Sequence, residues 1–317
     1  MRAGIVTSTS VLALLMLHQA PALTAPGHSA EGLEPPQERQ FTADYDQSVQ
    51  KYLLLLPMRF DPRVEHDLLI GFHGHGSDRR QYATESRGEC RGARDVAAKH
   101  DMIFISPDYR APAGWMGIAG EADTLQILGI LKRHYKVRKV FLVGGSMGGT
   151  AVLTFAALHP DLVDGVSSQN GLANLLEYGV DLHYVVSVQT AIKDAFGGRR
   201  DETPEQFKKR NPSAYESRSA EFHPEKFTMP LAVTVGDRDQ LAPPQSVLRL
   251  ARAVQKHNPN VLVIERPYGA HETNYDDTVA ALEFVIQATQ KGKAASGVDP
   301  HVRNNPDPGR GSAPSMP

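Results

Sequence analysis

The sequence predicts an α/β fold with a doubly wound, mostly parallel sheet covered by helices on both faces. Two observations favour it. Short apolar runs without polar alternation recur along the chain, as strands buried on both faces require, and segments with helical apolar periodicity lie between them. Such alternation implies right-handed crossover connections in an open sheet. Ligands of these sheets bind beyond the carboxyl ends of the strands.

The predicted strands are short, and most stop at or shortly before a glycine or proline. They cover residues 52–56, 67–72, 102–106, 140–143, 231–235 and 261–264, and the predicted helices cover 122–135, 147–158, 246–256 and 277–289. Residues 171–228 interrupt the alternation with a series of leucines and valines. This segment is expected to be a helical, cap-like insertion over the site.

Both ends of the chain are expected to lie outside the fold. Residues 1–22 have the features of a signal peptide: a cation at Arg2, an apolar run over 11–17 that is too short to cross a bilayer, and a small-x-small cleavage site at Ala20-Pro21-Ala22. Residues 23–40 are expected to be a linker. Residues 291–317 hold five prolines and four glycines and are expected to be a disordered tail, which leaves 41–290 as the folded domain. The signal peptide predicts a secreted or periplasmic protein that has no membrane association once the signal is cleaved.

Composition excludes several classes of protein. The 34 Lys and Arg nearly balance the 36 Asp and Glu, so the formal net charge of −2 disfavours a nucleic-acid partner. The single cysteine, Cys90, excludes a disulfide within the chain and any cysteine-based metal site. The oligomeric state stays open.

A strand-to-helix turn carries the first chemical motif. Gly144-Gly145-Ser146-Met147-Gly148 fits the pattern G-x-S-x-G and lies between a predicted strand and a predicted helix. The turn places a serine at its apex in a strained conformation, and glycines two before and two after it let the neighbouring backbone pass. Ser146 is therefore predicted to be a nucleophile.

A serine nucleophile needs a base and an acid that orients the base, and both candidates follow in the order serine, acid, histidine. Asp239 follows the strand at 231–235, and His271 follows the strand at 261–264. Asp237 competes for the role of the acid, but it comes directly after the strand-ending Gly236, where a solvent-facing turn residue is the simpler interpretation. Asp239 and His271 are therefore predicted to complete a triad.

An acyl-transfer enzyme also needs fixed N–H donors for its oxyanion. The expected donors are the N–H of Met147 and one N–H of the early glycine loop at 73–78, most simply that of His75, with Gly74 or Gly76 as alternatives. The rival interpretation is that His73 and His75 bind a metal in an H-x-H-x-D-H run. Ser77 and Asp78 stand where that run needs Asp and His, so neither a metal nor a cofactor is expected.

With nucleophile, acid, base and glycine loop in order, residues 45–288 resemble the α/β-hydrolase superfamily. The residues that carry the resemblance are the loop HGHGSD at 73–78 and the segments VGGSMGG at 143–149, ALHPDLVDGV at 157–166, GDRD at 236–239 and GAHE at 269–272. The match looks closest to the esterase and prolyl oligopeptidase-like branch, which includes feruloyl and acetylxylan esterases and polyhydroxybutyrate depolymerases. The propeller domain of the prolyl oligopeptidase family proper is expected to be absent, since only the linker separates the signal from the first strand.

The substrate side of the site is predicted less sharply. Tyr109 and Trp115 lie in a Gly/Pro-rich loop after the strand at 102–106 and are the expected substrate-binding residues. Trp115 either forms a substrate wall or closes the core. The prediction is a secreted serine hydrolase that cleaves a small-molecule or oligomeric carboxylic ester through an acyl-enzyme. The alternatives are a serine peptidase acting on short peptides and a non-catalytic binding module. A peptidase usually needs a charged group for a peptide terminus, and none can be identified in the sequence.

Overall fold

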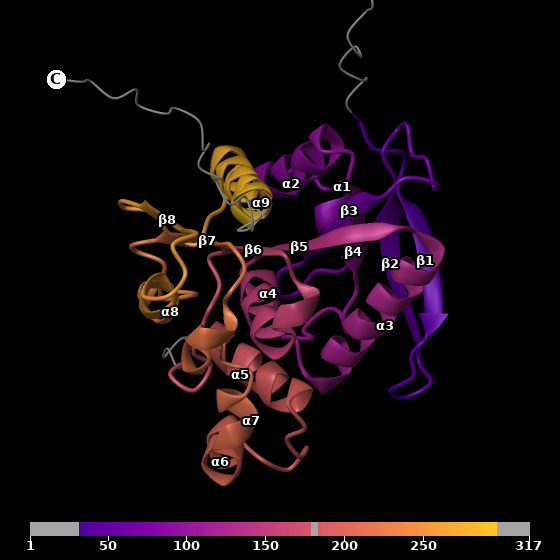
Figure 1. The fold of residues 1–317 in the computed structure, drawn as a ribbon. Helices are drawn as coiled ribbons and strands as arrows, with labels where there is room; N and C mark the ends of the chain where they lie inside the picture. Colours follow the sequence, from indigo (N-terminus) through magenta and orange to yellow (C-terminus); the bar gives the residue numbers. More distant parts are fainter. Residues whose placement is uncertain (1–31, 179–182, 297–317) are drawn as a thin grey trace, which may run out of the picture. The chain divides into compact units, whose positions relative to one another are not determined.

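A computed structural model describes residues 32–178 and 183–296, which contain an eight-stranded sheet in the order β1-β2-β4-β3-β5-β6-β7-β8 (Figure 1). β1 and β4 pair antiparallel with β2, and the other neighbouring strands pair parallel. The predicted doubly wound, mostly parallel sheet is therefore confirmed, and with it the α/β-hydrolase fold.

The strands are short, and β3, β4, β6 and β7 are buried along their whole length. Their bounds are β1 Gln37–Thr42, β2 Val49–Leu55, β3 His66–Phe72, β4 Ile103–Pro107, β5 Val137–Gly145, β6 Gly165–Gln169, β7 Leu231–Gly236 and β8 Val261–Arg266. In β3, Leu69 packs on one face of the sheet, and Leu68 and Ile70 pack on the other. Both faces need apolar side chains, which explains why the sequence of this strand shows no polar alternation.

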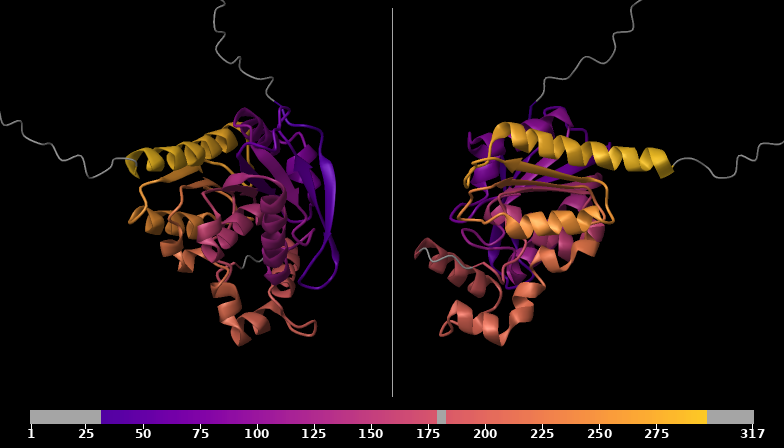
Figure 2. Two further views of the ribbon diagram at one scale, coloured as in Figure 1. Left: turned by 45° about the vertical axis from the view of Figure 1, so that its right-hand side comes forward. Right: turned by 90° about the vertical axis from the view of Figure 1, so that its left-hand side faces the viewer.

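The helices cover both faces of the sheet (Figures 1 and 2). α2 (Gly88–Lys99) and α9 (Tyr275–Ser296) pack together on one face, where Val96 and Leu282 share a cluster with Leu69. α3 (Ile118–His134), α4 (Met147–Leu158) and α8 (Gln245–Gln255) contribute to the cluster on the other face. No helix in the described ranges is long and apolar enough to span a membrane.

The expected insertion at 171–228 contains α5 (His183–Ala195), α6 (Pro204–Arg210) and α7 (Pro212–Glu216), which gather at one end of the ribbon in Figure 1. α6 begins with a capping box, in which Thr203 and Gln206 each accept a backbone N–H of the other. These helices follow β6, so they start at the carboxyl edge of the sheet, where ligands of such folds bind.

Several sequence-based boundaries are wrong. β1 begins at Gln37, inside the expected linker, because an edge strand can carry exposed polar residues and then resembles a linker in composition. β6 was not expected because its sequence, GVSSQ, is polar although the strand is buried. α2 and α1 (Arg80–Thr84) were also not expected, and α9 extends beyond residue 290 to Ser296. The expected signal peptide lies outside the described residues, as do residues 23–31 of the linker and 297–317 of the tail.

Candidate active site

Ser146 stands at the apex between β5 and α4, with φ of 58° and ψ of −119°, a conformation that residues with a side chain rarely adopt. The glycines on either side are required by packing. A Cβ at Gly144 would lie 2.4 Å from the carbonyl carbon of Gly148, and a Cβ at Gly148 would lie 2.0 Å from the carbonyl oxygen of Phe72. The strained turn predicted from the G-x-S-x-G pattern is therefore present.

The contact of Gly148 predicts a severe mutation. Gly148→Ala would place a methyl group against the backbone of β3, which cannot move without disturbing the centre of the sheet, so we expect a loss of several kcal/mol of unfolding free energy. Gly129→Ala in α3 is the matched control, because a Cβ there meets only the end of the Arg133 side chain at 3.4 Å. Thermal unfolding of both variants measures the difference. Equal melting temperatures would contradict the steric argument.

The structure brings Ser146, His271 and Asp239 into one hydrogen-bonded chain. The Oγ of Ser146 lies 2.8 Å from Nε2 of His271, and Nδ1 of His271 lies 2.7 Å from Oδ2 of Asp239. Asp239 follows β7 and His271 follows β8, as predicted from the chain order. With a proton on Nδ1 donated to Asp239, Nε2 is left to accept the proton of the serine hydroxyl.

Asp239 is held as a buried carboxylate. Its Oδ1 accepts the N–H groups of Leu241 and Ala242, each at 2.9 Å, and its Oδ2 accepts Nδ2 of Asn170 at 3.0 Å as well as His271. Burial alone would raise the pKa of Asp239, but the hydrogen bonds from His271, Ala242 and Asn170 outweigh it and the pKa is lowered. The competing Asp237 is exposed to solvent, so the geometry favours Asp239 as the acid.

The expected oxyanion donors lie beside Ser146. Met147 is the first residue of α4, and His75 lines the same cavities as Ser146. The two alternative donors are engaged elsewhere: the N–H of Gly74 donates to Oε1 of Gln81 at 2.7 Å, and the N–H of Gly76 donates to the carbonyl of Pro112 at 2.9 Å. These hydrogen bonds disfavour Gly74 and Gly76 as oxyanion donors, and the role of His75 stays a prediction.

The side chains of the glycine loop are used for structure. The ring nitrogens of His73 lie 2.8 and 3.0 Å from the carbonyl oxygens of Gly74 and Asp108. Nδ1 of His75 accepts Nε1–H of Trp115 at 3.2 Å. Burial lowers the pKa of both histidines, against the two carbonyl contacts in the case of His73. This arrangement is not that of a paired metal site, and the described residues contain no group of three metal-ligating side chains.

Tyr109 and Trp115 have different positions. The hydroxyl of Tyr109 donates to the carbonyl of His73 at 2.5 Å, and the ring of Tyr109 packs edge-on against Phe72. Tyr109 therefore stabilises the glycine loop from within the core. Neither cavity at Ser146 includes Tyr109, and its expected role in substrate binding is wrong because the loop turns this side chain into the core. Trp115 does line a cavity at Ser146.

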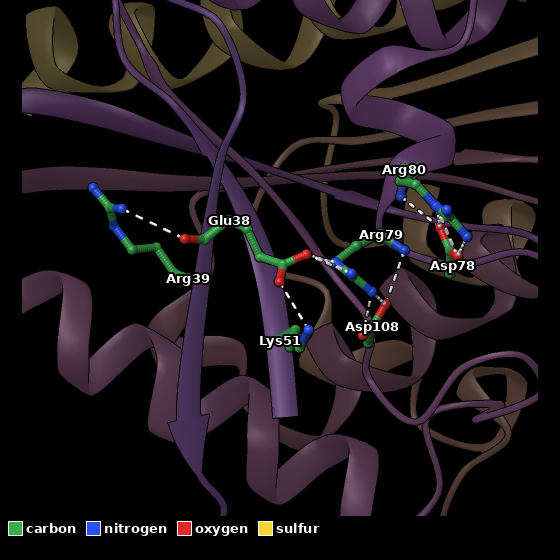
Figure 3. Close-up of polar contacts among 7 residues, drawn as sticks. All are labelled: Glu38, Arg39, Lys51, Asp78, Arg79, Arg80 and Asp108. Carbon is green, nitrogen blue, oxygen red and sulfur yellow. Dashed lines mark hydrogen bonds and ion pairs between the residues drawn. The ribbon is translucent and has the colours of Figure 1, made fainter. Parts of the chain in front are cut away.

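A charged network that the sequence did not reveal fixes the glycine loop from the antiparallel edge of the sheet. Figure 3 shows Arg79 between the carboxylates of Glu38 on β1 and Asp108 after β4. Arg79 reaches Glu38 at 2.5 Å and Asp108 at 3.0 Å, and Lys51 on β2 adds a contact of 2.8 Å to Glu38. The carbonyl oxygen of Asp108 also contacts Nε2 of His73. The network therefore connects β1 and β2 to the glycine loop that holds the expected oxyanion donor.

Two cavities meet at Ser146, His75 and His271. The first, of about 50 Å³, is mostly apolar and is lined further by Trp115, Thr150, Leu172, Tyr178, Val188, Leu241 and Ala242. The second, of about 260 Å³, is polar and contains Glu85, Arg87 and Glu89 from the α1–α2 region. Sequence reasoning missed these charged residues because neither helix was expected. Only their proximity to Ser146 in space distinguishes them from surface charges.

The fold and the site together define a serine hydrolase. A family model described as the prolyl oligopeptidase family matches residues 122–291, which is more than half of the chain. The chain therefore belongs to the prolyl oligopeptidase family, a member of the α/β-hydrolase superfamily, as its resemblance indicated.

Solved structures share the fold at low sequence identity. A Bacteroides ovatus protein assigned as a dipeptidyl aminopeptidase IV is 17% identical, with a TM-score of 0.60, over 83% of this chain and 36% of that one. A puromycin hydrolase is 16% identical, with a TM-score of 0.60, over 84% and 41% of the two chains. A puromycin-hydrolysing peptidase of Mycobacterium tuberculosis is 16% identical, with a TM-score of 0.61, over 81% and 40%.

This chain spans about two fifths of the length of those proteins. No curated protein matches the sequence.

The family match overturns one expectation: the predicted cleavage of carboxylic esters is wrong, because the family and the similar structures are those of peptidases. Ester and peptide hydrolysis use the same triad, so the motifs that predicted the triad could not distinguish them.

Proposed function

We propose that this protein is a serine peptidase of the prolyl oligopeptidase type that hydrolyses short peptides through an acyl-enzyme. The observation that carries the proposal is the hydrogen-bonded chain Ser146–His271–Asp239 at a strained strand-to-helix turn, in a chain that belongs to a peptidase family.

The geometry supports a two-step mechanism. Oγ of Ser146 attacks the peptide carbonyl while Nε2 of His271 takes the hydroxyl proton, and Asp239 stabilises the imidazolium that forms. The N–H groups of Met147 and His75 stabilise the oxyanion. His271 then gives its proton to the leaving amine as the C–N bond breaks, and a water molecule, deprotonated by His271, hydrolyses the acyl-enzyme to release the acid.

A direct test is to incubate the purified full-length chain with a mixture of short synthetic peptides and to identify the products by mass spectrometry. We expect cleavage at internal amide bonds, and we expect it to disappear after treatment with a fluorophosphonate that modifies active serines. A protein that binds these peptides but leaves all of them intact would be a binding module that has kept only the fold, and the proposal would fail.

The small apolar cavity suggests which residue precedes the cleaved bond. A volume of about 50 Å³ between Trp115, Tyr178 and Val188 suits a small apolar side chain and excludes a large aromatic one. We therefore propose that alanine or proline at this position is preferred over phenylalanine by at least about tenfold in kcat/KM.

A pair of substitutions on α5 tests this preference. Val188 is buried against the cavity, and Val186, two residues earlier, is 58% exposed. Val188→Ala should enlarge the cavity and lower the ratio of kcat/KM for the alanine substrate to kcat/KM for the phenylalanine substrate. Val186→Ala should leave this ratio unchanged. The measurement is kcat/KM on peptide anilides that differ only in this residue. Equal wild-type rates for phenylalanine and alanine would contradict the assignment of the cavity.

A further inference from the structure

We infer that Arg87, held in place by Glu89, binds the terminal carboxylate of the leaving part of the substrate, so that the enzyme prefers peptide bonds close to a free C-terminus. The inference rests on the proposed peptidase function. It assigns a role to the polar cavity, which the mechanism above does not use.

The polar cavity is continuous with the reacting groups. It contains Ser146, His271 and the loop at His75 together with Glu85, Arg87 and Glu89. The apolar cavity, which meets it at Ser146, suits the side chain on the acyl side of the cleaved bond. The polar cavity is then left for the leaving group. Its volume of about 260 Å³ lies just below the usual range for ligand pockets, which suits a leaving group of one or two residues.

Within the Arg87–Glu89 ion pair, the guanidinium is the group exposed to the cavity. The side chain of Glu89 is only 4% exposed, whereas the side chain of Arg87 is 56% exposed. Nε of Arg87 contacts Oε1 of Glu89 at 2.6 Å, so the buried carboxylate fixes the side chain through the nitrogen nearest the backbone. This contact uses Nε, and the terminal Nη1 and Nη2 belong to the planar fork that can bind a carboxylate through two hydrogen bonds.

Glu85 lines the same cavity and opposes the binding of an anion. A substitution of Glu85 therefore provides a second, independent test. Removing the charge of Glu85 should strengthen the preference for a free carboxylate, and removing the charge of Arg87 should abolish it.

Arg80 provides a matched control for Arg87. It is also exposed, at 69% of its side chain, and it also pairs with a carboxylate two positions away, that of Asp78. However, it lines a neighbouring surface hollow that contains neither Ser146 nor His271. A general effect of lost positive charge would therefore appear in both variants, and a specific contact only in Arg87→Gln.

The experiment measures kcat/KM on one short peptide made as the free acid and as the C-terminal amide, with the cleaved bond two residues from the end. We expect the wild-type protein and Arg80→Gln to favour the acid by about tenfold or more. Arg87→Gln should cleave acid and amide at the wild-type rate for the amide, and Glu85→Gln should raise the ratio of acid to amide.

Equal rates for acid and amide in the wild-type protein, or an unchanged ratio in Arg87→Gln, would overturn the inference and leave the peptidase function intact. Failure to cleave either peptide, or any other short peptide, would instead count against the proposed function. The two failures are therefore distinguishable in a single set of assays.

Discussion

Ser146→Ala is expected to lower the rate of peptide hydrolysis by about 10⁶-fold, because it removes the only oxygen that lies within hydrogen-bond reach of Nε2 of His271 among the described residues. The hydroxyl lies at the surface of a cavity, and within residues 32–178 and 183–296 its hydrogen bond is to His271, so the variant should unfold at the wild-type temperature. Peptide hydrolysis and thermal unfolding, measured on the same preparation, check both expectations. Activity within tenfold of the wild-type value would place the nucleophile elsewhere.

Asp239→Asn is expected to lower kcat by about 10⁴-fold, because an amide cannot hold the tautomer of His271 that accepts the serine proton. The substitution leaves an oxygen that can still accept the N–H groups of Leu241 and Ala242, so the turn itself should survive. The effect should therefore appear in kcat rather than in the folded fraction.

Asp237→Asn is the matched control for this prediction. Asp237 lies two residues away in the same turn, is exposed and has no contact with His271 among the hydrogen bonds of the described residues, so its substitution should change kcat little. The reverse ranking of the two variants would move the orienting acid to Asp237 and would contradict the geometry described above.

The parts of the site that could be predicted from the sequence are those that obey steric or topological rules. Ser146 was identifiable because a strained turn needs glycines at fixed distances, and the structure shows the contacts that forbid a Cβ at Gly144 and Gly148. Asp239 and His271 were identifiable because the carboxyl ends of parallel strands meet at one edge of the sheet. Their order along the chain restricted the choice further.

The parts that could not be predicted depend on packing between distant segments. The sequence placed Tyr109 and Trp115 in the same loop, and only the structure shows that Tyr109 supports His73 whereas Trp115 faces a cavity. Arg87 and Glu89 could not be identified because charged residues are common in helical segments, and the sequence does not show that Glu89 is buried. The sequence does not reveal that the two side chains form an ion pair or that this pair lies beside Ser146.

Elements with ambiguous composition were missed for a related reason. β1 is polar because it is an edge strand, and β6 is polar although buried, since Ser168 donates to the carbonyl of Gly149 inside the protein. A rule that recognises strands by apolar runs finds neither. The proposed action on peptides rather than esters was also beyond these rules, because the same triad serves both reactions.

Ser146 is expected to form the acyl-enzyme with a peptide substrate. The most direct measurement is to mix the protein with a good peptide substrate, quench in acid within the first turnover and locate the added acyl mass by peptide mapping. The structure predicts that the mass equals that of the segment on the acyl side of the cleaved bond and that it is attached to Ser146. Product formation with unmodified Ser146, or with the acyl group on another residue, would contradict the account.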